Sequence, residues 1–276
     1  MDAADTADQP AWSSFSNFLQ ASARVLCLVG AGLSAPSGLA TWRGANGLWN
    51  DINLRELASP QKFREDPVTV WRFYGERLLE TLAAQPNAAH HALASLARRH
   101  AAWLTVNQNV DGLLEQTAHP ISMLRSIHGQ LRIVRCTACD YKIEITRPHD
   151  IPFLQLLSKP GDESRALGLS DLPHCPYCSK LLRPGVVWFG EKLAAGAPDS
   201  IDEWISEGPI DLVIAAGTSL QVFPAAEWVY IAQAHGAALA VIDLDDHLPN
   251  ENLEVDWFFK GNIEVTLPEV VNMMSI

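Results

Sequence analysis

Long apolar runs and positive charge are both scarce in this chain of 276 residues. No apolar run approaches the ~20 residues that a membrane-spanning helix needs, so we expect no membrane association. The 20 lysine and arginine residues are outnumbered by 32 aspartate and glutamate residues, which gives a net charge of −12. This balance argues against direct nucleic-acid binding, which needs a basic surface, and favours basic partners such as lysine-rich tails.

The first 23 residues contain Asp2, Asp5 and Asp8 but neither lysine nor arginine. This composition is the opposite of a mitochondrial presequence, and no basic start with a following apolar segment signals secretion. We therefore expect a cytoplasmic or nuclear monomer, and whether a partner carries it into mitochondria stays open. We expect residues 1–12 to be disordered because they are acidic and terminal.

Cysteine is also rare, with five residues, of which four form two Cys-x-x-Cys pairs. Four thiolates can surround a metal tetrahedrally and leave no position for water or substrate, so the pattern predicts one structural Zn²⁺. Two unrelated reduced pairs, or a redox pair, are the less favoured alternatives. Cys27 lies in a buried strand pattern and receives no role. The predicted zinc ligands are Cys136, Cys139, Cys175 and Cys178.

Continuous apolar runs that end in small or polar residues alternate with helical patterns. Runs without polar alternation are typical of strands buried on both faces of a parallel sheet. The sequence therefore predicts an α/β fold with a doubly wound, Rossmann-like parallel sheet, which binds ligands at the carboxyl ends of its strands. The predicted strands are Val25–Val29, Trp103–Val106, Leu212–Ala216 and Leu239–Ile242, and the predicted helices between them include Asn87–Arg99 and Ala225–His235.

Two segments interrupt this alternation and are expected to form a smaller domain. Residues 45–85 make its helical module, in which Asp66 caps a helix that begins at Pro67 and extends to about Ala83. Residues 130–182 make its zinc-binding module. The remaining segments, 24–44, 86–129 and 183–276, make the large domain, after an N-terminal segment of residues 1–23.

A strand that runs into Gly30-Ala31-Gly32 is how a backbone approaches nucleotide phosphates, although glycines also occur in plain turns. The wider pattern decides between these interpretations. G-A-G-L-S-A-P-S-G at 30–38 leads to T-W-R-G at 41–44, followed by Q-N-V-D at 108–111, His128-Gly129 and the two cysteine pairs. From about residue 24 to 271 the chain resembles the sirtuins, NAD-dependent protein-lysine deacylases.

The resemblance implies an NAD site along the strand ends. Gln108, Asn109 and Asp111 would line its nicotinamide end, where amide groups can both donate and accept. Trp42 stands where relatives have Phe, and Asp243 where many have Asn. The remaining implied cofactor residues are Gly30, Ala31, Gly32, Ser34, Thr41 and Arg43 in the loop, Gly217, Thr218 and Ser219 at the phosphates and ribose, and Ile263 at the adenine.

His128 is the candidate base. A histidine pKa of about 6.5 suits proton transfer near neutral pH, although most of the nine histidines here are expected to be structural. By resemblance, His128 deprotonates a ribose hydroxyl after the acyl-lysine carbonyl oxygen has displaced nicotinamide.

The segment Val186–Glu191 resembles the sirtuin substrate strand, which pairs with an extended peptide, and without the resemblance it would be an ordinary apolar strand. Its expected substrate-binding residues are Val187, Trp188, Phe189, Gly190 and Glu191.

Tyr74 and Arg77 share a face of the predicted helix. From the residues alone, the Arg77 partner is Glu80 or solvent. The pattern Y-x-x-R resembles the class III sirtuins, whose Tyr and Arg hold succinyl, malonyl or glutaryl carboxylates, and Ala45 matches a small residue that widens their acyl pocket. The expected function is removal of acidic acyl groups from lysine.

Three other functions stay open at this point. The first is a plain deacetylase, and the second is a catalytically silent NAD or ADP-ribose binding module. A hydride-transferring dehydrogenase is disfavoured, since G-A-G-x-S is not G-x-G-x-x-G and a closed zinc site offers no Lewis acid.

Overall fold

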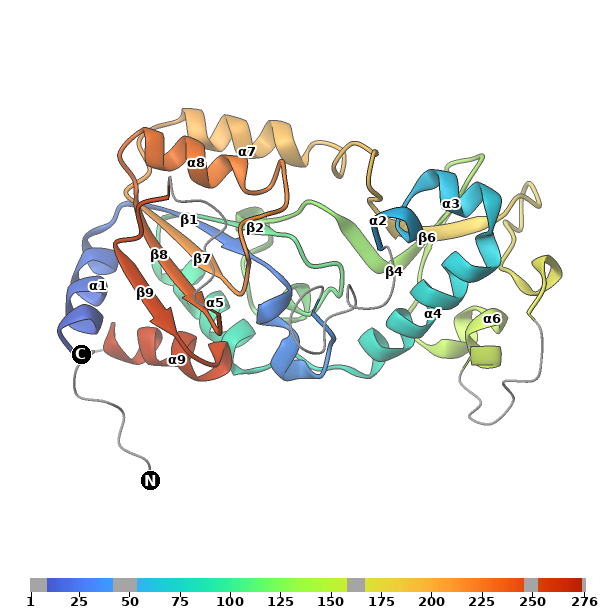
Figure 1. Cartoon of the computed structure of the whole chain (residues 1–276), viewed down its shortest axis with the longest axis horizontal. Coiled ribbons are helices and arrows are strands. Elements are labelled where there is room, and N and C mark those ends of the chain that lie inside the picture. The colour runs from blue at the N-terminus through green and yellow to red at the C-terminus, as the bar shows by residue number, and fades with distance from the viewer. Residues whose placement is uncertain (1–8, 42–53, 158–166, 246–252, 275–276) are drawn as a thin grey trace, which may run out of the picture.

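A parallel six-stranded sheet forms the centre of the large domain (Figure 1). The computed structural model describes residues 9–41, 54–157, 167–245 and 253–274. The strand order is β3-β2-β1-β7-β8-β9, and every neighbouring pair is parallel, so the predicted doubly wound fold and its four strands are confirmed. The strands are β1 (Arg24–Val29), β2 (Ala102–Asn107), β3 (Leu124–Ser126), β7 (Leu212–Ala216), β8 (Ala238–Asp243) and β9 (Trp257–Lys260).

Helices cover both faces of this sheet, which explains why its strands are apolar on both sides. One face packs against α1, α5 and α9, and the other against α7 and α8 (Figure 1). The chain turns from β1 toward β2 on one side and later adds β7 on the other, so the strand order reverses beside β1. Ligands of such sheets bind at this reversal. The helices are α1 (Gln9–Ala21), α5 (Ala88–Arg99), α7 (Ala197–Ser206), α8 (Glu227–Ala234) and α9 (Ile263–Met273).

The N-terminal helix α1 corrects one expectation. Disorder over residues 9–12 is wrong, because α1 begins at Gln9. Phe15 and Leu19 are buried in the sheet core, and the Trp12 ring lies 4.0 Å from the Phe259 ring, measured between centroids. Trp12, Phe15 and Leu19 follow a three- and four-residue spacing that places them on one helix face. This spacing predicts a helix, but the acidic composition was given more weight.

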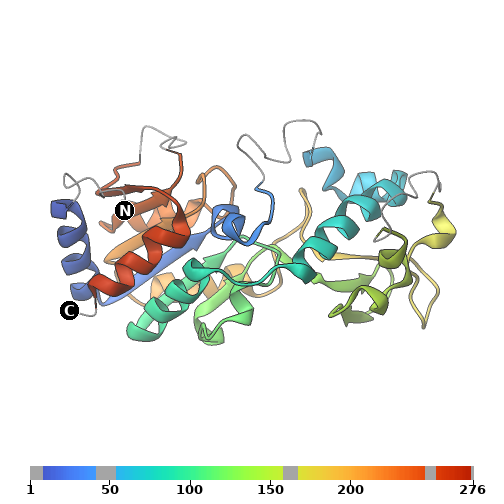
Figure 2. The same cartoon turned by 90° about the horizontal axis from the view of Figure 1, so that it is seen from below.

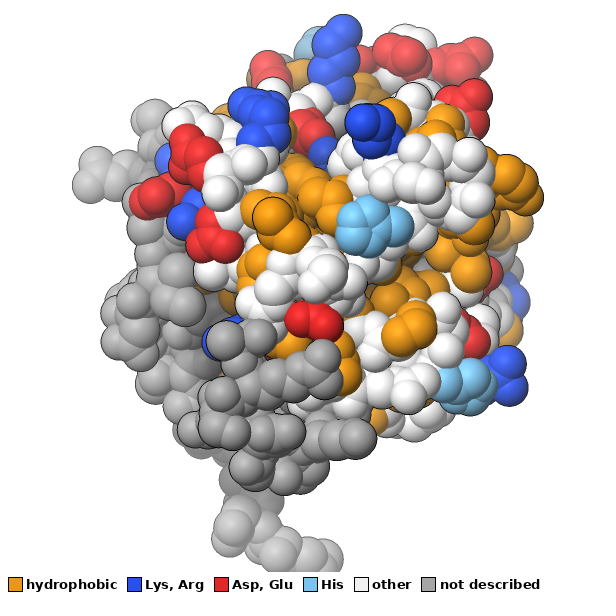
Figure 3. All heavy atoms as spheres, turned by 90° about the vertical axis from the view of Figure 1, so that its right-hand side faces the viewer, with side chains coloured by type: hydrophobic (Ala, Val, Ile, Leu, Met, Phe, Trp, Pro, Cys, Tyr) orange, Lys and Arg blue, Asp and Glu red, His pale blue; other side chains and the backbone are white. Residues whose placement is uncertain are grey.

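The small domain lies at the opposite end of the molecule from α1 (Figure 2). It contains an antiparallel sheet of order β5-β4-β6 with helices packed on it. Figure 3 views this end, where exposed apolar side chains lie among charged ones. Its elements are α2 (Leu54–Leu57), α3 (Pro60–Glu65), α4 (Pro67–Ala83), β4 (Gly129–Cys136), β5 (Lys142–Glu144), α6 (Pro152–Leu157) and β6 (Leu182–Val186).

Helix α4 has the predicted bounds and cap. Its first residue is Pro67, and the Asp66 carboxylate accepts a hydrogen bond from the Thr69 amide at 3.1 Å. Its buried face packs on α6, and a Cβ at Gly75 would lie 2.5 Å from Leu157. The helix is therefore fixed closely against the rest of the small domain. Among the described residues, no helix is long and apolar enough to span a bilayer.

Candidate active site

Three glycines bring the loop after β1 against the turn after β7. The Gly32 amide donates to the Gly217 carbonyl at 2.9 Å, and the Gly30 amide donates to Ala216 at 3.1 Å. A Cβ at Gly32 would lie 2.6 Å from Gly217 Cα, and Gly217 has φ +60°. These close backbone contacts explain why glycine is needed at these positions even without a ligand. They add to the approach to phosphates that the sequence predicts.

The polar residues after β2 cross-link the ends of three strands. Gln108 Nε2 donates to Thr218 Oγ1 at 2.8 Å and to the Val29 carbonyl at 3.2 Å. Asn109 Nδ2 donates to the Gly30 carbonyl at 2.9 Å. The predicted nicotinamide-end residues therefore meet at the carboxyl edge of the sheet.

Ser34 is the centre of a buried hydrogen-bond chain. Its hydroxyl donates to Asp111 Oδ2 at 2.7 Å, and Asn109 Nδ2 lies 3.3 Å from Ser34 Oγ. His90 Nδ1 accepts the Asn87 amide, which places its proton on Nε2, 3.4 Å from Ser34 Oγ. The chain of donors thus runs from His90 through Ser34 to Asp111.

Burial shifts both ends of this chain toward neutral forms. It lowers the pKa of His90 to about 4, with a smaller contribution from His91. It also raises the pKa of Asp111, against the opposing hydrogen bonds from Leu113 and Ser34. His90 was not among the predicted site residues. Its signal was a histidine three residues after the Asn87 cap on a face otherwise apolar.

His128 is half-buried at the junction of the two domains. Its Nδ1 lies 2.8 Å from the Gln108 carbonyl, which can only accept, so Nδ1 carries the proton and Nε2 the lone pair. Burial lowers the pKa of His128 below its ordinary value, while the Gln108 carbonyl acts in the opposite direction. At neutral pH the ring is therefore an unprotonated base.

A first pocket lies at the adenine and ribose end predicted from the sequence. It brings Gly32, Gly217, Asp243 and Ile263 together. Asp243 is its only charged lining residue among the described part of the chain, and burial raises the pKa of this carboxyl. Ser219 lies two residues beyond Gly217 and does not line either described pocket. Thr41 ends the described part of the loop, and Trp42, Arg43 and Ala45 lie outside the described residues.

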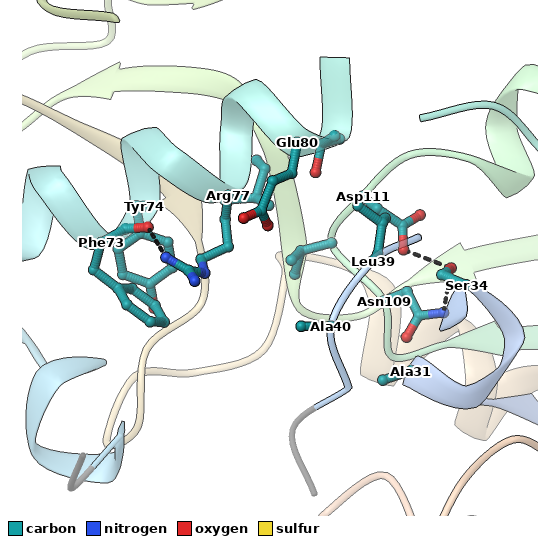
Figure 4. A pocket seen from close by; sticks show the side chains of 13 residues that line it. Ala31, Ser34, Leu39, Ala40, Phe73, Tyr74, Arg77, Glu80, Asn109 and Asp111 are labelled. Atoms are coloured by element: carbon teal, nitrogen blue, oxygen red, sulfur yellow. Dashed lines mark hydrogen bonds between the residues drawn. The ribbon is translucent and has the colours of Figure 1, made fainter. Parts of the chain in front are cut away.

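A second pocket joins the nicotinamide end to helix α4 (Figure 4). Tyr74, Arg77 and Glu80 lie on its α4 side, with Asn109 and Asp111 opposite. The remaining lining residues are Ala31, Ser34, Leu39, Ala40, Phe73, Thr81, Val110 and Leu131.

The Arg77 guanidinium bonds to neither Glu80 nor solvent alone, the two partners that the residues suggested, but to Glu76. Nη1 donates to Glu76 Oε2 at 3.0 Å and to the Phe73 carbonyl at 3.2 Å, so Glu80 as its hydrogen-bonding partner is wrong. The guanidinium carbon lies 4.6 Å from the Phe73 ring centroid. Tyr74 is 5% exposed, and burial raises the pKa of its hydroxyl.

The predicted substrate strand needs a partial correction. Strand β6 ends at Val186, and residues 189–190 form a turn. The Val187 amide donates to the His128 carbonyl at 2.8 Å, which brings this segment beside the candidate base. The chain leaves the strand because Trp188, which is 2% exposed, packs into the small-domain core near Phe63.

A half-buried ion pair holds this turn. Arg183 donates to both oxygens of Glu191, at 2.6 and 2.9 Å, and its guanidinium lies 3.5 Å from the Trp188 ring centroid. Glu191 also accepts the Trp188 amide at 2.9 Å. Burial opposes ionisation of Glu191, but these hydrogen bonds prevail and lower its pKa. Glu191 therefore fixes the turn itself, and Phe189 and Gly190 are the exposed residues at its tip.

The four predicted zinc ligands form one cluster. Their sulfur atoms all lie within 4.8 Å of one another. Cys136 Sγ is 3.4 Å from Cys178 Sγ, and Cys139 Sγ is 3.6 Å from Cys175 Sγ. Tetrahedral zinc with Zn–S bonds of about 2.3 Å requires sulfur separations of about 3.8 Å, so the donor set could hold a zinc ion with small adjustments.

Comparisons with known proteins agree with this geometry. The sequence model of the Sir2 family matches residues 30–224. The NAD-dependent protein deacylase of Candida albicans is 36% identical over 289 residues, covering 92% of this chain and 94% of that protein. A solved Sir2 homologue mutant in complex with ADP-ribose has a TM-score of 0.80 at 35% identity and covers 95% of this chain and 96% of its own. Sir2 solved with a deacetylated p53 peptide and 3′-O-acetyl ADP-ribose has a TM-score of 0.80 at 27% identity, covering 95% and 98%.

The chain therefore belongs to the Sir2, or sirtuin, family. It is an NAD-dependent protein deacylase, and its cofactor is NAD. The four clustered cysteines could in addition hold one zinc ion.

Proposed function

We propose that this deacylase removes negatively charged acyl groups, namely succinyl, malonyl and glutaryl, from lysine side chains. The observation that supports this preference is the second pocket, in which Arg77 lies on the wall opposite Asn109 and Asp111. The carboxylate of a succinyl chain that enters between these walls can bond to the Arg77 guanidinium. An acetyl group ends in a methyl and cannot form this bond. A charge-assisted hydrogen bond of this kind contributes about 1.5–3 kcal/mol.

The bonding of Arg77 leaves capacity for such a carboxylate. Within the described residues, its buried Nε has no hydrogen-bond partner. Its ionic partner Glu76 has a side chain that is 48% exposed, so their pair is weak and can be replaced. Stacking on Phe73 holds the guanidinium in place without occupying its donors.

The substrate is proposed to be an acyl-lysine in an extended peptide. Support comes from the segment 187–190, whose Val187 lies beside His128, and from the related Sir2 structure with a p53 peptide. We infer that His128 Nε2 takes the proton of a ribose hydroxyl after the acyl oxygen has displaced nicotinamide. The Gln108 carbonyl holds the ring in the required tautomer. The products are nicotinamide, free lysine and O-acyl-ADP-ribose.

The decisive experiment compares succinyl- and acetyl-peptide turnover by the wild type and Arg77→Met. This change keeps the stem and removes the charge, so kcat/KM for desuccinylation should fall at least about tenfold while deacetylation is unchanged or improved. Tyr74→Phe should act in the same direction by less. Arg72→Met is the control, because Arg72 is exposed on the same helix. Equal losses on both substrates would show that Arg77 only supports α4.

The Glu76–Arg77 pair favours a second candidate, a plain deacetylase in which the guanidinium is already neutralised. Faster deacetylation than desuccinylation by the wild type would select it. A silent NAD-binding module would bind NAD without releasing nicotinamide in the presence of either peptide.

A further inference from the structure

We infer that Glu115 is a positioning residue that holds the segment carrying His128. The inference rests on the proposed role of His128 as the base. Glu115 lies in a short 3₁₀ helix, Leu114–Gln116, outside every motif that the sequence singled out. Its Oε1 accepts hydrogen bonds from Ser126 Oγ at 2.5 Å and from Gln130 Nε2 at 2.9 Å.

These two donors lie on either side of His128 in the chain. Ser126 is the last residue of β3, and Gln130 is the second residue of β4. The turn between them is tight, because Gly129 has φ +76° and a Cβ there would lie 2.2 Å from the Gly185 carbonyl. One carboxylate oxygen thus ties together both ends of the segment on which the base is mounted.

The same contacts connect the base to the nicotinamide end. Asn107, 1% exposed, donates from Nδ2 to Ser126 Oγ at 3.3 Å and accepts the Asn109 amide on Oδ1 at 2.9 Å. Glu115, Ser126 and Asn107 therefore link the position of His128 to that of Asn109. Small displacements of a reacting group can lower a rate about a hundredfold, so this link bears on turnover.

The acceptor oxygen, and not the charge, carries this role. Both hydrogen bonds go to Oε1, whereas Oε2 is buried and has no hydrogen-bond partner among the described residues. A glutamine keeps an oxygen that can accept from both donors. It replaces an unpartnered charged atom by a neutral one, which is less costly to bury.

The test compares Glu115→Ala with Glu115→Gln. Steady-state deacylation and incorporation of labelled nicotinamide into NAD are measured with the peptide that the wild type turns over best. Incorporation reports nicotinamide displacement, which precedes the step assigned to His128. Glu115→Ala should lower kcat about tenfold or more, with incorporation and the KM for NAD within about threefold. Glu115→Gln should restore at least a third of the wild-type kcat.

Two further variants keep the outcome clear. Ser126→Ala removes one of the two hydrogen bonds to Glu115 and should lower kcat less than Glu115→Ala does. It replaces Glu115→Ala in the test if that variant folds poorly. Gln116→Ala is the matched control, since Gln116 is exposed in the same 3₁₀ helix and its side chain donates to the Gly112 carbonyl, away from His128. Equal losses in Glu115→Ala and Glu115→Gln, equal loss of incorporation and turnover, or normal turnover in Glu115→Ala would each overturn the inference. Full turnover by His128→Ala would instead refute the base assignment.

Discussion

The cofactor end and the acyl end of the site are built from different kinds of structure. At the cofactor end, the loop at Gly30 and Gly32 and the turn at Gly217 are joined by backbone hydrogen bonds at the edge of a buried parallel sheet. At the acyl end, Tyr74 and Arg77 are presented by a helix whose position depends on side-chain packing within the small domain. The first end depends on backbone approach and tolerates few side chains, whereas the second depends on side-chain identity.

This difference suggests that damage to the small domain should impair use of the acylated substrate before it impairs NAD binding. The two ends meet at Asn109 and Asp111, which line the pocket shared with α4. Variants placed on either side of this boundary therefore test how independent the ends are.

The largest effect is expected from the cysteine cluster. Cys136→Ser should destroy the metal site, whose zinc would supply about 10 kcal/mol or more to a small module. The small domain should become protease-sensitive and deacylation should be lost, while NAD still binds to the sheet domain. Zinc analysis, limited proteolysis and NAD titration measure these outcomes. Cys27→Ala is the control and should keep its zinc, because Cys27 is buried in β1. Loss of NAD binding in Cys136→Ser would show that the ends are not independent.

A second, smaller effect is expected at the turn beside His128. Glu191→Ala leaves the Arg183 guanidinium, with a side chain only 10% exposed, without its ionic partner. Removing one member of a fully buried pair costs about 3–5 kcal/mol, and the loss here should lie below this range because the Glu191 side chain is 21% exposed. Peptide KM should rise strongly while the KM for NAD changes little. Adding Arg183→Met to this variant should recover part of the stability, measured by urea unfolding. No recovery would mean that the pair acts mainly by shaping the turn.

On the cofactor side, His90 should make stability dependent on pH. Its pKa is lowered to about 4 in the folded protein, so the folded ring stays neutral while the unfolded ring gains a proton near pH 6.5. The contribution is therefore present above pH 6.5 and is lost as pH falls toward 4, by at most about 3 kcal/mol. Urea unfolding at pH 7 and pH 5 should show a smaller decrease for His90→Gln than for the wild type. Parallel decreases would exclude His90 as the source.

The smallest effect is expected at Asp243. Asp243→Asn keeps one acceptor oxygen and removes the charge, so the KM for NAD should rise only about twofold to fivefold. Burial raises the pKa of Asp243. As the solution is acidified, the wild-type KM for NAD should therefore begin to rise at a higher pH than it would if Asp243 had an ordinary pKa. The variant should lack this rise. Changes in the acetyl-to-succinyl preference would contradict the separation of the two ends.

Short-range patterns predicted most of the fold. The buried strands followed from unbroken apolar runs, and helix α4 followed from Asp66 and Pro67. The terminal helix α1 was missed because acidic composition was given more weight than its apolar spacing. The predicted substrate strand at 186–191 was too long, since an apolar run does not reveal that Trp188 packs into the small-domain core.

The site was predicted where a motif concentrated it and missed where it depends on distant contacts. The cysteine cluster and the residues after β2 came together as expected. Glu115 carries no local signal, because its partners lie in other elements. His90 has a local signal in the cap of α5, but its contact with Ser34 is distant in the chain and was missed. Helical spacing suggested Glu80 or solvent as the partner of Arg77 within the chain, whereas the exposed Glu76 side chain reaches the guanidinium from the adjacent position.

The central pairing of the large sheet has a consequence for synthesis. Val25 in β1 lies beside Leu212 in β7, so β1 acquires this neighbour only after the whole small domain has left the ribosome. Chains are made from the N-terminus, and domains generally fold as units. The small domain, although interrupted in the chain by α5, β2 and β3, is complete by Val186 and can form its own core first. Its folding then draws together the large-domain segments before, between and after its two parts and shortens the loop that the β1–β7 pairing must close.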